Sequence, residues 1–427
     1  MSPADPPPMA ASTAAGFGPP ASRLTVRQTF AALQHRNYRL WFVGQMTSLF
    51  GTWMQTTAQS FLVFELTRSP AYLGYVGFAS GVPTWLFMLY GGVISDRVSR
   101  RTLLVVTQTS MMVPAFVLAA LTFAGVVQPW HILVLAFALG LANAFDAPAR
   151  QAFVSELVER RDLTNAIALN ALMFNSATAV GPAVAGITYD LFGPGWCFTL
   201  NGLSFVAVIA ALVAMRFAPR PAAARGASAA AELKEALVYV ASQPVVRALI
   251  ALIGMMSGFG IALLTLLPAW AVTILHGDAT TNGLLQSARG VGALLSALLI
   301  ASLARFAFKG RLLTAGTFAF PAFAFLFAFT RSLPLSLVAL AALGASVIFV
   351  NNLANALVQS IVPDAMRGRV MGVYTLTFFG LMPIGALWVG TLADRIGEPA
   401  TVVAAALIWF GVASTAWVFA PQLRKLK

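Results

Sequence analysis

The segment Gly92-Val-Ile-Ser-Asp96-Arg97-Val-Ser-Arg100-Arg101 is a short charged turn between two long apolar stretches, residues 71–95 and 102–124. Its four charged side chains lie in a connection that is too short to be a domain. Each flanking stretch, as a helix, is long enough to cross the roughly 30 Å hydrocarbon core of a bilayer. The segment therefore predicts two membrane helices that are held in register by a charged turn.

The composition is that of a membrane protein, because 59% of the 427 residues are hydrophobic, 10% are charged and the mean hydropathy is +0.81. A soluble protein of this size could not bury so much apolar surface. Twelve apolar segments recur, and we expect all-α structure because open strands would leave backbone groups unpaired in lipid. The twelve segments are 38–66, 71–95, 102–124, 129–150, 165–190, 196–216, 244–275, 280–303, 312–329, 334–358, 367–393 and 399–420.

The basic residues predict the orientation of these helices. If the N-terminus is inside, 23 of the 27 lysine and arginine residues fall on inner connections or tails. Arg68, Arg331 and Arg395 fall outside, and Arg289 falls within a segment. Positive charge accumulates on the cytoplasmic side of membrane proteins, so we expect both termini in the cytoplasm. The net charge of +13 is scattered among connections, which argues against nucleic acid as a partner.

The twelve segments divide into two halves of six. We expect an N-terminal half at 38–216, a cytoplasmic linker with a short amphipathic helix at 217–243, and a C-terminal half at 244–420. Residues 1–37 are expected to be a disordered tail with a pre-helix segment, and 421–427 a basic tail. Both tails are expected to be cytoplasmic.

Two local matches support an internal repeat of the halves. Gly186, Asp190 and Gly193 recur as Gly390, Asp394 and Gly397, all offset by 204 residues, and Asn143, Asp146 and Arg150 are matched in position by Asn352, Asn355 and Gln359, offset by 209. Only polarity recurs in the second set. Chance similarity between two apolar helices is the alternative.

Several chemistries are disfavoured by what the chain contains. No lysine follows a glycine, so the chain has no Gly-x-x-x-x-Gly-Lys phosphate loop for ATP. Its three histidines are far apart and form no metal-ligand spacing, and its single cysteine, Cys197, excludes an intrachain disulfide. We therefore expect no metal, no cofactor and no enzymatic activity, with a non-transporting membrane enzyme as a distant alternative.

The first membrane segment carries a polar stripe that indicates a cavity or a packing face. Its side chains follow steps of three and four residues, which places them on one helix face: Gln45, Ser48, Thr52, Gln55 and Gln59. A polar stripe facing lipid is costly, so it faces protein or water. Interhelical hydrogen bonding is one interpretation. We favour cavity lining, because the stripe covers about four turns.

Charged residues inside or beside the other segments are further candidates. Asp146 and Arg150 are spaced to pair on one helix, with Asn143 one turn earlier. Arg289 could hold an anionic group, pair with a proton-carrying acid, or extend to the outer surface. Glu65, at the outer end of the first segment, is a possible proton-coupling site, and a local pair with Arg68 is the alternative.

The charged turn resembles the loop 2–3 signature of the major facilitator superfamily, although Ser99 stands where that family usually has glycine. Further stretches resemble its bacterial exporters of the enterobactin-exporter and macrolide-efflux type. These are Arg36-Asn-Tyr-Arg39-Leu-Trp41, Gly44-Gln45, Gly51-Thr-Trp53-Met-Gln55, Asp146-Ala-Pro-Ala-Arg150-Gln-Ala-Phe-Val-Ser-Glu156-Leu-Val and Leu163-Thr-Asn165-Ala-Ile-Ala-Leu-Asn170. Gly181-Pro182-Ala-Val-Ala185-Gly186 resembles the helix 5 motif of antiporters in that superfamily. If the position of Ser99 requires a positive φ, serine is strained there by about 1–2 kcal/mol.

The resemblance implies a major facilitator fold of twelve helices and a secondary transporter that works by alternating access. It implies a gating network in which Gly92, Asp96, Arg97, Arg100 and Arg101 meet Asp146, Arg150 and the start of the eleventh segment. That network would stabilise the outward-facing state and break when the cytoplasmic side opens.

From this resemblance we expect a monomeric proton antiporter in the bacterial cytoplasmic membrane. Its cargo would be a small organic molecule, either a siderophore or an amphipathic drug. The alternative is a lysophospholipid or metabolite transporter of the same fold.

Overall fold

The computed structural model describes residues 30–216, 229–303, 309–419 and 422, and all regular structure within them is helical. A short 3-10 turn, η1 (Ala31–Gln34), precedes the first long helix. The long helices of the first group are α2 (Arg36–Thr67), α3 (Pro70–Arg97), α4 (Arg100–Phe123), α5 (Pro129–Leu157), α6 (Leu163–Phe192) and α7 (Pro194–Ala214). The second group contains α9 (Pro244–Met255), α11 (Ala279–Leu303), α12 (Lys309–Phe329), α13 (Leu333–Ile361), α14 (Asp364–Ile396) and α15 (Glu398–Phe419).

Each expected segment overlaps one of these helices, and the limits agree to within three residues except that α5 continues seven residues beyond the expected end at 150. The seventh expected segment continues beyond α9 as an irregular helix. That helix passes through the π turn η3 (Met256–Gly260), the 3-10 turn η4 (Ile261–Leu266), α10 (Leu267–Ala269) and the π turn η5 (Trp270–Ile274). Such turns loosen or tighten the backbone where a helix bends. The expected linker contains α8 (Ala229–Ser242).

Eleven described helices or helical runs are long and apolar enough to cross a membrane. α2, with 32 residues, is long enough but is not one of the eleven, and it carries the polar stripe. Many large apolar side chains on the helices are exposed, among them Leu191 at 69% and Val338 at 67%. Exposed apolar surface on this scale fits helices that face lipid.

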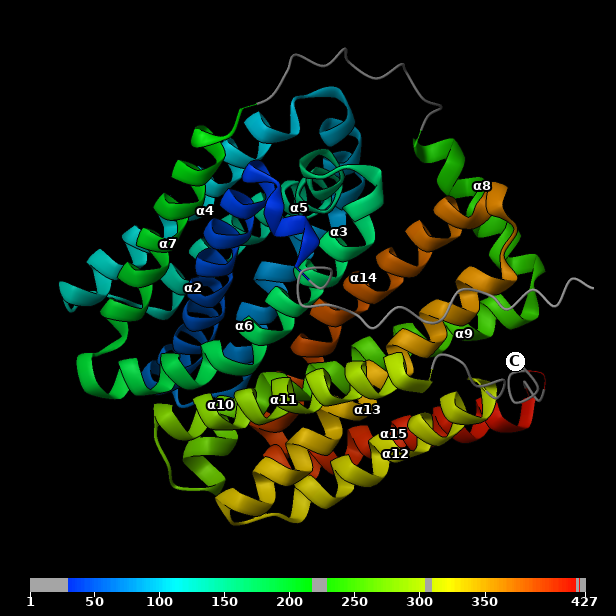
Figure 1. Cartoon of the computed structure of the whole chain (residues 1–427). Helices are drawn as coiled ribbons and strands as arrows, with labels where there is room; N and C mark the ends of the chain where they lie inside the picture. The colour runs from blue at the N-terminus through cyan, green and yellow to red at the C-terminus, as the bar shows by residue number, and fades with distance from the viewer. Residues whose placement is uncertain (1–29, 217–228, 304–308, 420–421, 423–427) are drawn as a thin grey trace, which may run out of the picture.

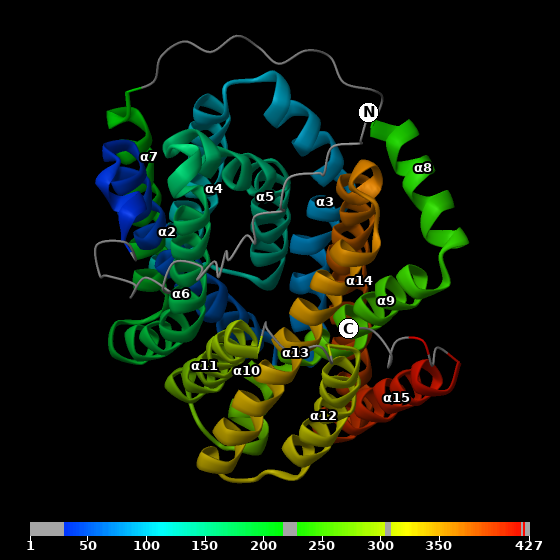
Figure 2. The same ribbon diagram turned by 45° about the vertical axis from the view of Figure 1, so that its right-hand side comes forward.

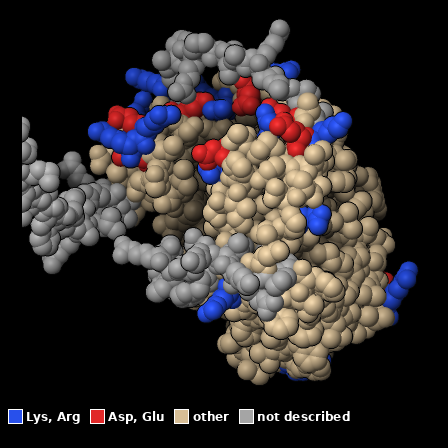
Figure 3. Space-filling model, turned by 90° about the vertical axis from the view of Figure 1, so that its right-hand side faces the viewer, with Lys and Arg blue, Asp and Glu red and all other residues tan. Residues whose placement is uncertain are grey.

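Figures 1 and 2 show that α2 to α7 form one group and α9 to α15 a second group inclined to it. The groups diverge toward the end of the molecule where α3, α5 and α7 end and where α8 and α14 begin; we name this the linker end. At the opposite end, α2 and α6 terminate and α3 and α11 begin. Figure 3 shows charged side chains gathered at the linker end, with a hollow between the two groups.

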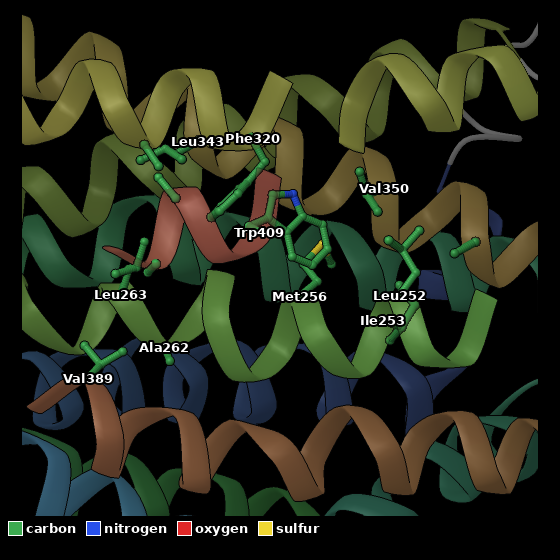
Figure 4. Packing of buried hydrophobic residues seen from close by; sticks show 14 of the residues in the cluster. Leu252, Ile253, Met256, Ala262, Leu263, Phe320, Leu343, Val350, Val389 and Trp409 are labelled. Carbon is green, nitrogen blue, oxygen red and sulfur yellow. The ribbon is translucent and has the colours of Figure 1, made fainter. Parts of the chain in front are cut away.

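The second group has its own apolar core around the irregular helix (Figure 4). Met256, Phe320 and Trp409 meet there from η3, α12 and α15, and all are at most 2% exposed. The indole of Trp409 donates to the carbonyl of Thr317 at 2.8 Å and packs edge-on against Phe320. This core makes the group a packed unit whose helices can move together.

Two seams join the groups, and both lie toward the opposite end. The first seam packs α6 on α11, and the second packs α3 on α14. Glycines bring the backbones together: a Cβ on Gly186 would lie 2.4 Å from the carbonyl oxygen of Ala279, and one on Gly390 would lie 2.7 Å from that of Pro70. Small residues allow such close approach between membrane helices.

Candidate functional site

Arg100 is the centre of the charged turn. Its guanidinium contacts Glu156 of α5 at 2.7 Å and Asp96, one turn back along the chain, at 3.5 Å. It therefore ties the start of α4 to the end of α5 within the first group. Glu156 was not predicted to have a role, because its partner lies 56 residues away in the chain.

Arg101 and Ser99 shape the same turn. Arg101 donates to the carbonyls of Leu212 and Val213 at 2.7 and 2.8 Å, which satisfies the last turn of α7. Ser99 has φ −53°, so the strain anticipated for a positive φ is absent. Gly92 is half-buried, and no atom lies within 4 Å of where its Cβ would be.

Asp146 is a buried carboxylate, only 1% exposed. Its Oδ1 accepts hydrogen bonds from Thr107 at 2.9 Å and from Gln108 at 2.8 Å, both on α4. Its Oδ2 lies 3.6 Å from Nε of Arg150 and has no hydrogen-bond partner. The expected pairing on α5 is thus present but long, and the amide and hydroxyl donors were not anticipated.

The expected network across the groups is not formed in this conformation. The Asp96 side chain is 71% exposed and Arg97 is exposed. Near the start of α14, Arg369 pairs instead with Glu235 of the linker helix α8 at 2.6 Å. The physical reason is the separation of the groups at the linker end (Figure 2). The network therefore stays a prediction for a state in which the linker end is closed.

The polar stripe of α2 is mostly a packing face here, contrary to the favoured interpretation. Gln45, Ser48, Gln55 and Gln59 are at most 6% exposed, and Asn201 of α7 donates to Gln55 at 2.6 Å. Gln55 in turn donates to Gln59 at 3.4 Å. The half-buried Thr52 bonds the carbonyl of Ser48. Buried amides need such partners, and α7 supplies one to Gln55, whereas the buried Oε1 of Gln45 has none among the described residues.

The asparagines expected on α5 and α13 are more accessible. Asn143 is exposed, and Asn352 and Asn355 are half-buried. Asn355 accepts from Gln359 at 2.6 Å. The phenol of Tyr374 donates to Asn351, a residue that was not among the predicted site residues.

Arg289 lies at the first seam with its guanidinium over the indole ring of Trp53, 5.6 Å from the ring centroid. Trp53 belongs to α2, so this contact joins the two groups. Phe174 of α6 packs edge-on against the same indole at 6.0 Å and is 48% exposed. Arg289 therefore does not extend to the outer surface, which was one of its predicted alternatives, because its guanidinium lies over Trp53.

The helix 5 motif forms part of the first seam. A Cβ on Gly181 would meet Trp53, and the carbonyl of Pro182 lies against Gly283 of α11. Pro182 cannot donate to the carbonyl of Thr178, and Gly290 of α11 packs on that carbonyl. The motif therefore serves the junction between groups.

Glu65 is bound by Tyr189 and not by Arg68, the neighbour with which a local pair was the predicted alternative. It is exposed at the opposite end and accepts a short hydrogen bond from the hydroxyl of Tyr189 on α6. Arg68 has φ 53° and ends α2, and among the described residues it forms no ion pair with Glu65. The left-handed cap turns the chain so that the local pair does not form.

Asp190 and Asp394 occupy equivalent positions at the opposite end. Asp190 of α6 accepts from the backbone N–H of Thr280 in the first turn of α11 at 2.7 Å. Asp394 of α14 accepts from the hydroxyl of Ser69, the residue before α3, at 2.6 Å. Each seam thus ends in an acid from one group that holds a helix start of the other.

Two helical groups sealed at one end, parted at the other and rich in membrane-length apolar helices define a transporter of the major facilitator type. Solved structures support this fold: a variant of the nucleoside transporter NupG matches with TM-score 0.74 at 14% identity, covering 90% of this chain and 98% of its own. A D-xylose–proton symporter matches with TM-score 0.72 at 14% identity, covering 90% and 98%. The family model of transmembrane secretion effectors matches residues 27–426, and the chain belongs to this family of the major facilitator superfamily.

Characterised relatives resemble the chain over most of its length. The staphyloferrin A transporter of Staphylococcus aureus is 21% identical, covering 84% of this chain and 90% of its own. The multidrug efflux pump Tap of Mycolicibacterium fortuitum is 27% identical, covering 89% and 95%. The enterobactin exporter EntS of Citrobacter koseri is 25% identical, covering 88% of each. The chain is an integral membrane transporter and not an enzyme.

Proposed function

We propose that the chain is a twelve-helix secondary exporter with two repeated halves that carries a small organic molecule out of the bacterial cytoplasm. α2 would be the twelfth span, with its polar stripe turned toward α7. The names of the relatives support a siderophore or an amphipathic drug as cargo. The positive charge of the connections supports a cytoplasmic linker end and cytoplasmic termini. The transporter works as a monomer.

The observation that carries this proposal is the asymmetric closure of the two groups. The first seam is packed from Gly186 on Ala279 to Gly290 on Thr178, and the second from Gly390 on Pro70 to Gly380 on Trp85. Nearer the linker end the groups diverge (Figure 2). With the linker end in the cytoplasm, this is an inward-facing state ready to take cargo from the cell.

The gating network belongs to the other state. When the linker end closes, the start of α14 approaches the charged turn, where Asp96 and Arg97 are exposed and available. A carboxylate near the first turn of α14 gains from the helix dipole, by about 0.3–1 kcal/mol when exposed. Asp96 thereby stabilises the outward-facing state.

Proton coupling requires a carboxyl that changes its protonation during the cycle. Asp146 is buried beside Arg150 and has one oxygen without a hydrogen bond. Glu65 is the second candidate, at the opposite end and bound to Tyr189. Intramembrane acids commonly mark proton relays in transporters.

The test is purified protein in liposomes with an imposed pH gradient. We expect flux of an amphipathic dye or a siderophore that follows the gradient, and we expect Asp96→Asn to reduce it sharply while the protein remains folded. Unchanged flux in Asp96→Asn would contradict the gating role. Chemical turnover without flux would contradict the transporter itself.

A thermal-shift screen in detergent narrows the cargo. Siderophores, antibiotics and lysolipids are compared, because a bound ligand raises apparent stability by mass action. Stabilisation by lysolipids alone would favour the lysophospholipid alternative.

A further inference from the structure

Arg289 is a cation placed deep in the membrane region. It is the eleventh residue of α11, which puts it about 15 Å along the helix from its start. That distance is half the roughly 30 Å hydrocarbon thickness. The backbone of Arg289 packs closely on α13, because its carbonyl oxygen lies only 2.2 Å from where a Cβ on Gly344 would be.

The charge has no partner among the described residues. The Nε of Arg289 is buried without a hydrogen bond, and no described carboxylate lies within ion-pair distance. Within the part of the chain that the structure describes, the guanidinium has neither an ionic nor a hydrogen-bonding partner and contacts the ring of Trp53. Arg289 is half-buried with its Nε inaccessible, and a charge held at this depth without an ionic or hydrogen-bonding partner is costly, so the position calls for an anion from elsewhere.

Aromatic side chains flank the unpaired charge. Trp53 lies under the guanidinium, and Phe174 stands edge-on to the same indole with 48% of its surface exposed. Gly290, the next residue of α11, makes the last recorded glycine contact of the first seam before the groups diverge. Arg289, Trp53 and Phe174 therefore lie beside the end of the first seam that is nearer the linker end.

A second arginine that packs on a tryptophan differs from Arg289 in its hydrogen bonds. Arg331 also lies over an indole, that of Trp270, at 6.0 Å. Its guanidinium, however, donates to the carbonyls of Ala328 and Thr330 at 2.9 and 2.8 Å. Arg331 is thus satisfied by backbone, whereas Arg289 keeps its donors for a ligand.

We propose that Arg289, Trp53 and Phe174 form the substrate site and that it takes an organic anion, a carboxylate carried on an aromatic or other flat apolar body. The carboxylate pairs with the planar donor fork of Arg289, and the flat body stacks on the aromatic side chains. This inference rests on the proposed export function. Because Arg289 and Trp53 belong to different groups, a bound anion contacts both groups when the opposite end is sealed.

The test uses three probes with one ring system and different charge: 1-naphthoate, 1-naphthylmethanol and 1-naphthylmethylamine. Binding to the purified full-length protein in detergent is measured by thermal shift and by titration calorimetry. We expect wild type to bind naphthoate at least about tenfold more tightly than the neutral and cationic probes, as a charged hydrogen bond contributes. Equal affinity for all three probes would overturn the proposal.

Variants of Arg289, Arg331 and Trp53 test whether the preference for naphthoate arises at the proposed site. Arg289→Gln is expected to lose about tenfold to a hundredfold in naphthoate affinity, and Arg331→Gln is expected to lose none. Arg289→Lys keeps the charge, guards against a folding defect and is expected to retain part of the preference. Trp53→Phe should weaken all three probes alike. Unchanged naphthoate binding in Arg289→Gln would overturn the assignment.

The two proposals fail in different ways. Liposome flux of a dye that follows the pH gradient, together with no preference for naphthoate, leaves the exporter standing and refutes the anion site. Preferential naphthoate binding that depends on Arg289, without any flux, refutes export and leaves the site standing.

Discussion

Replacing Gly186 by alanine should push the transporter out of its present conformation. A Cβ at this position would lie 2.4 Å from the carbonyl oxygen of Ala279 and 2.7 Å from the Cα of Thr280. Both are backbone atoms in the first turn of α11, so no flexible side chain can move aside. The overlap arises only while the first seam is closed.

The size of the effect follows from the cost of overpacking. An extra carbon forced into a packed contact costs about 1–3 kcal/mol. At about 2 kcal/mol, the population ratio of the two conformations changes by roughly 30-fold toward the state with the opposite end open. Gly390→Ala, which would meet Pro70 on the second seam, should act in the same direction.

The assay is a spin-label distance across the linker end. Cysteines replace the exposed Ser155 on α5 and Ser242 at the end of α8, in a background in which the buried Cys197 is alanine. We expect Gly186→Ala to shift the distance distribution toward shorter values, because closing the linker end accompanies opening of the seam.

Gly411→Ala is the matched control. No atom lies within 4 Å of its Cβ position on α15, so it changes helix propensity without touching a seam. The reasoning is refuted if Gly186→Ala gives the same distance distribution as Gly411→Ala while both proteins remain folded.

Three further predictions concern single side chains. Asn201→Ala removes the donor to the buried Gln55 and should destabilise the protein by about 1–3 kcal/mol, seen as a lower Tm than in Asn143→Ala. Asp146→Asn keeps an acceptor for Thr107 and Gln108 but cannot titrate; if Asp146 carries the proton, pH-driven flux in liposomes falls about tenfold or more while substrate exchange persists. Hydrogen bonds from the backbone N–H and hydroxyl of Thr281 lower the pKa of Asp278, which lies before α11. A lowered pKa adds stability that is complete above the usual value near 3.9 and declines as the pH falls through the lowered pKa. The free energy of unfolding of wild type should therefore exceed that of Asp278→Ala by about 1 kcal/mol at pH 6 to 8, and the difference should shrink steadily as the pH falls below about 4. Equal stability of the two proteins at pH 6 to 8 would exclude the cap.

The helix limits were predictable because a bilayer imposes length and hydrophobicity on every span. Proline and charge then mark the ends: α3, α5 and α7 each begin at a proline, and α4 begins at Arg100 beside the charged turn. Among the expected spans, α2 is long enough to cross a membrane but is not counted with the eleven apolar spans, because its polar stripe lowers its hydropathy.

Partners were harder to predict, because spacing fixes a helix face but not what lies opposite. The stripe on α2 could face water or a helix, and the deciding residue, Asn201, lies 146 positions from Gln55. Glu65 was compared with its neighbour Arg68, yet its partner Tyr189 is 124 residues away. The proposed gating network would form only in another conformation, and no local pattern encodes which conformation a chain adopts.

The matching seams bear on how such a chain could arise. In each seam a glycine and an acid at the end of one helix hold the start of a helix from the other group: Gly186 with Asp190, and Gly390 with Asp394. A contact that is made once in each direction is what a two-fold symmetric dimer makes. A single ancestral unit pairing with its own copy would already possess both seams, and gene duplication followed by fusion would preserve them. Arg289 lies on α11 at the first seam, and α3 at the second seam has no charged residue between Pro70 and Tyr90. This difference would then date from after the fusion, when each copy became free to specialise.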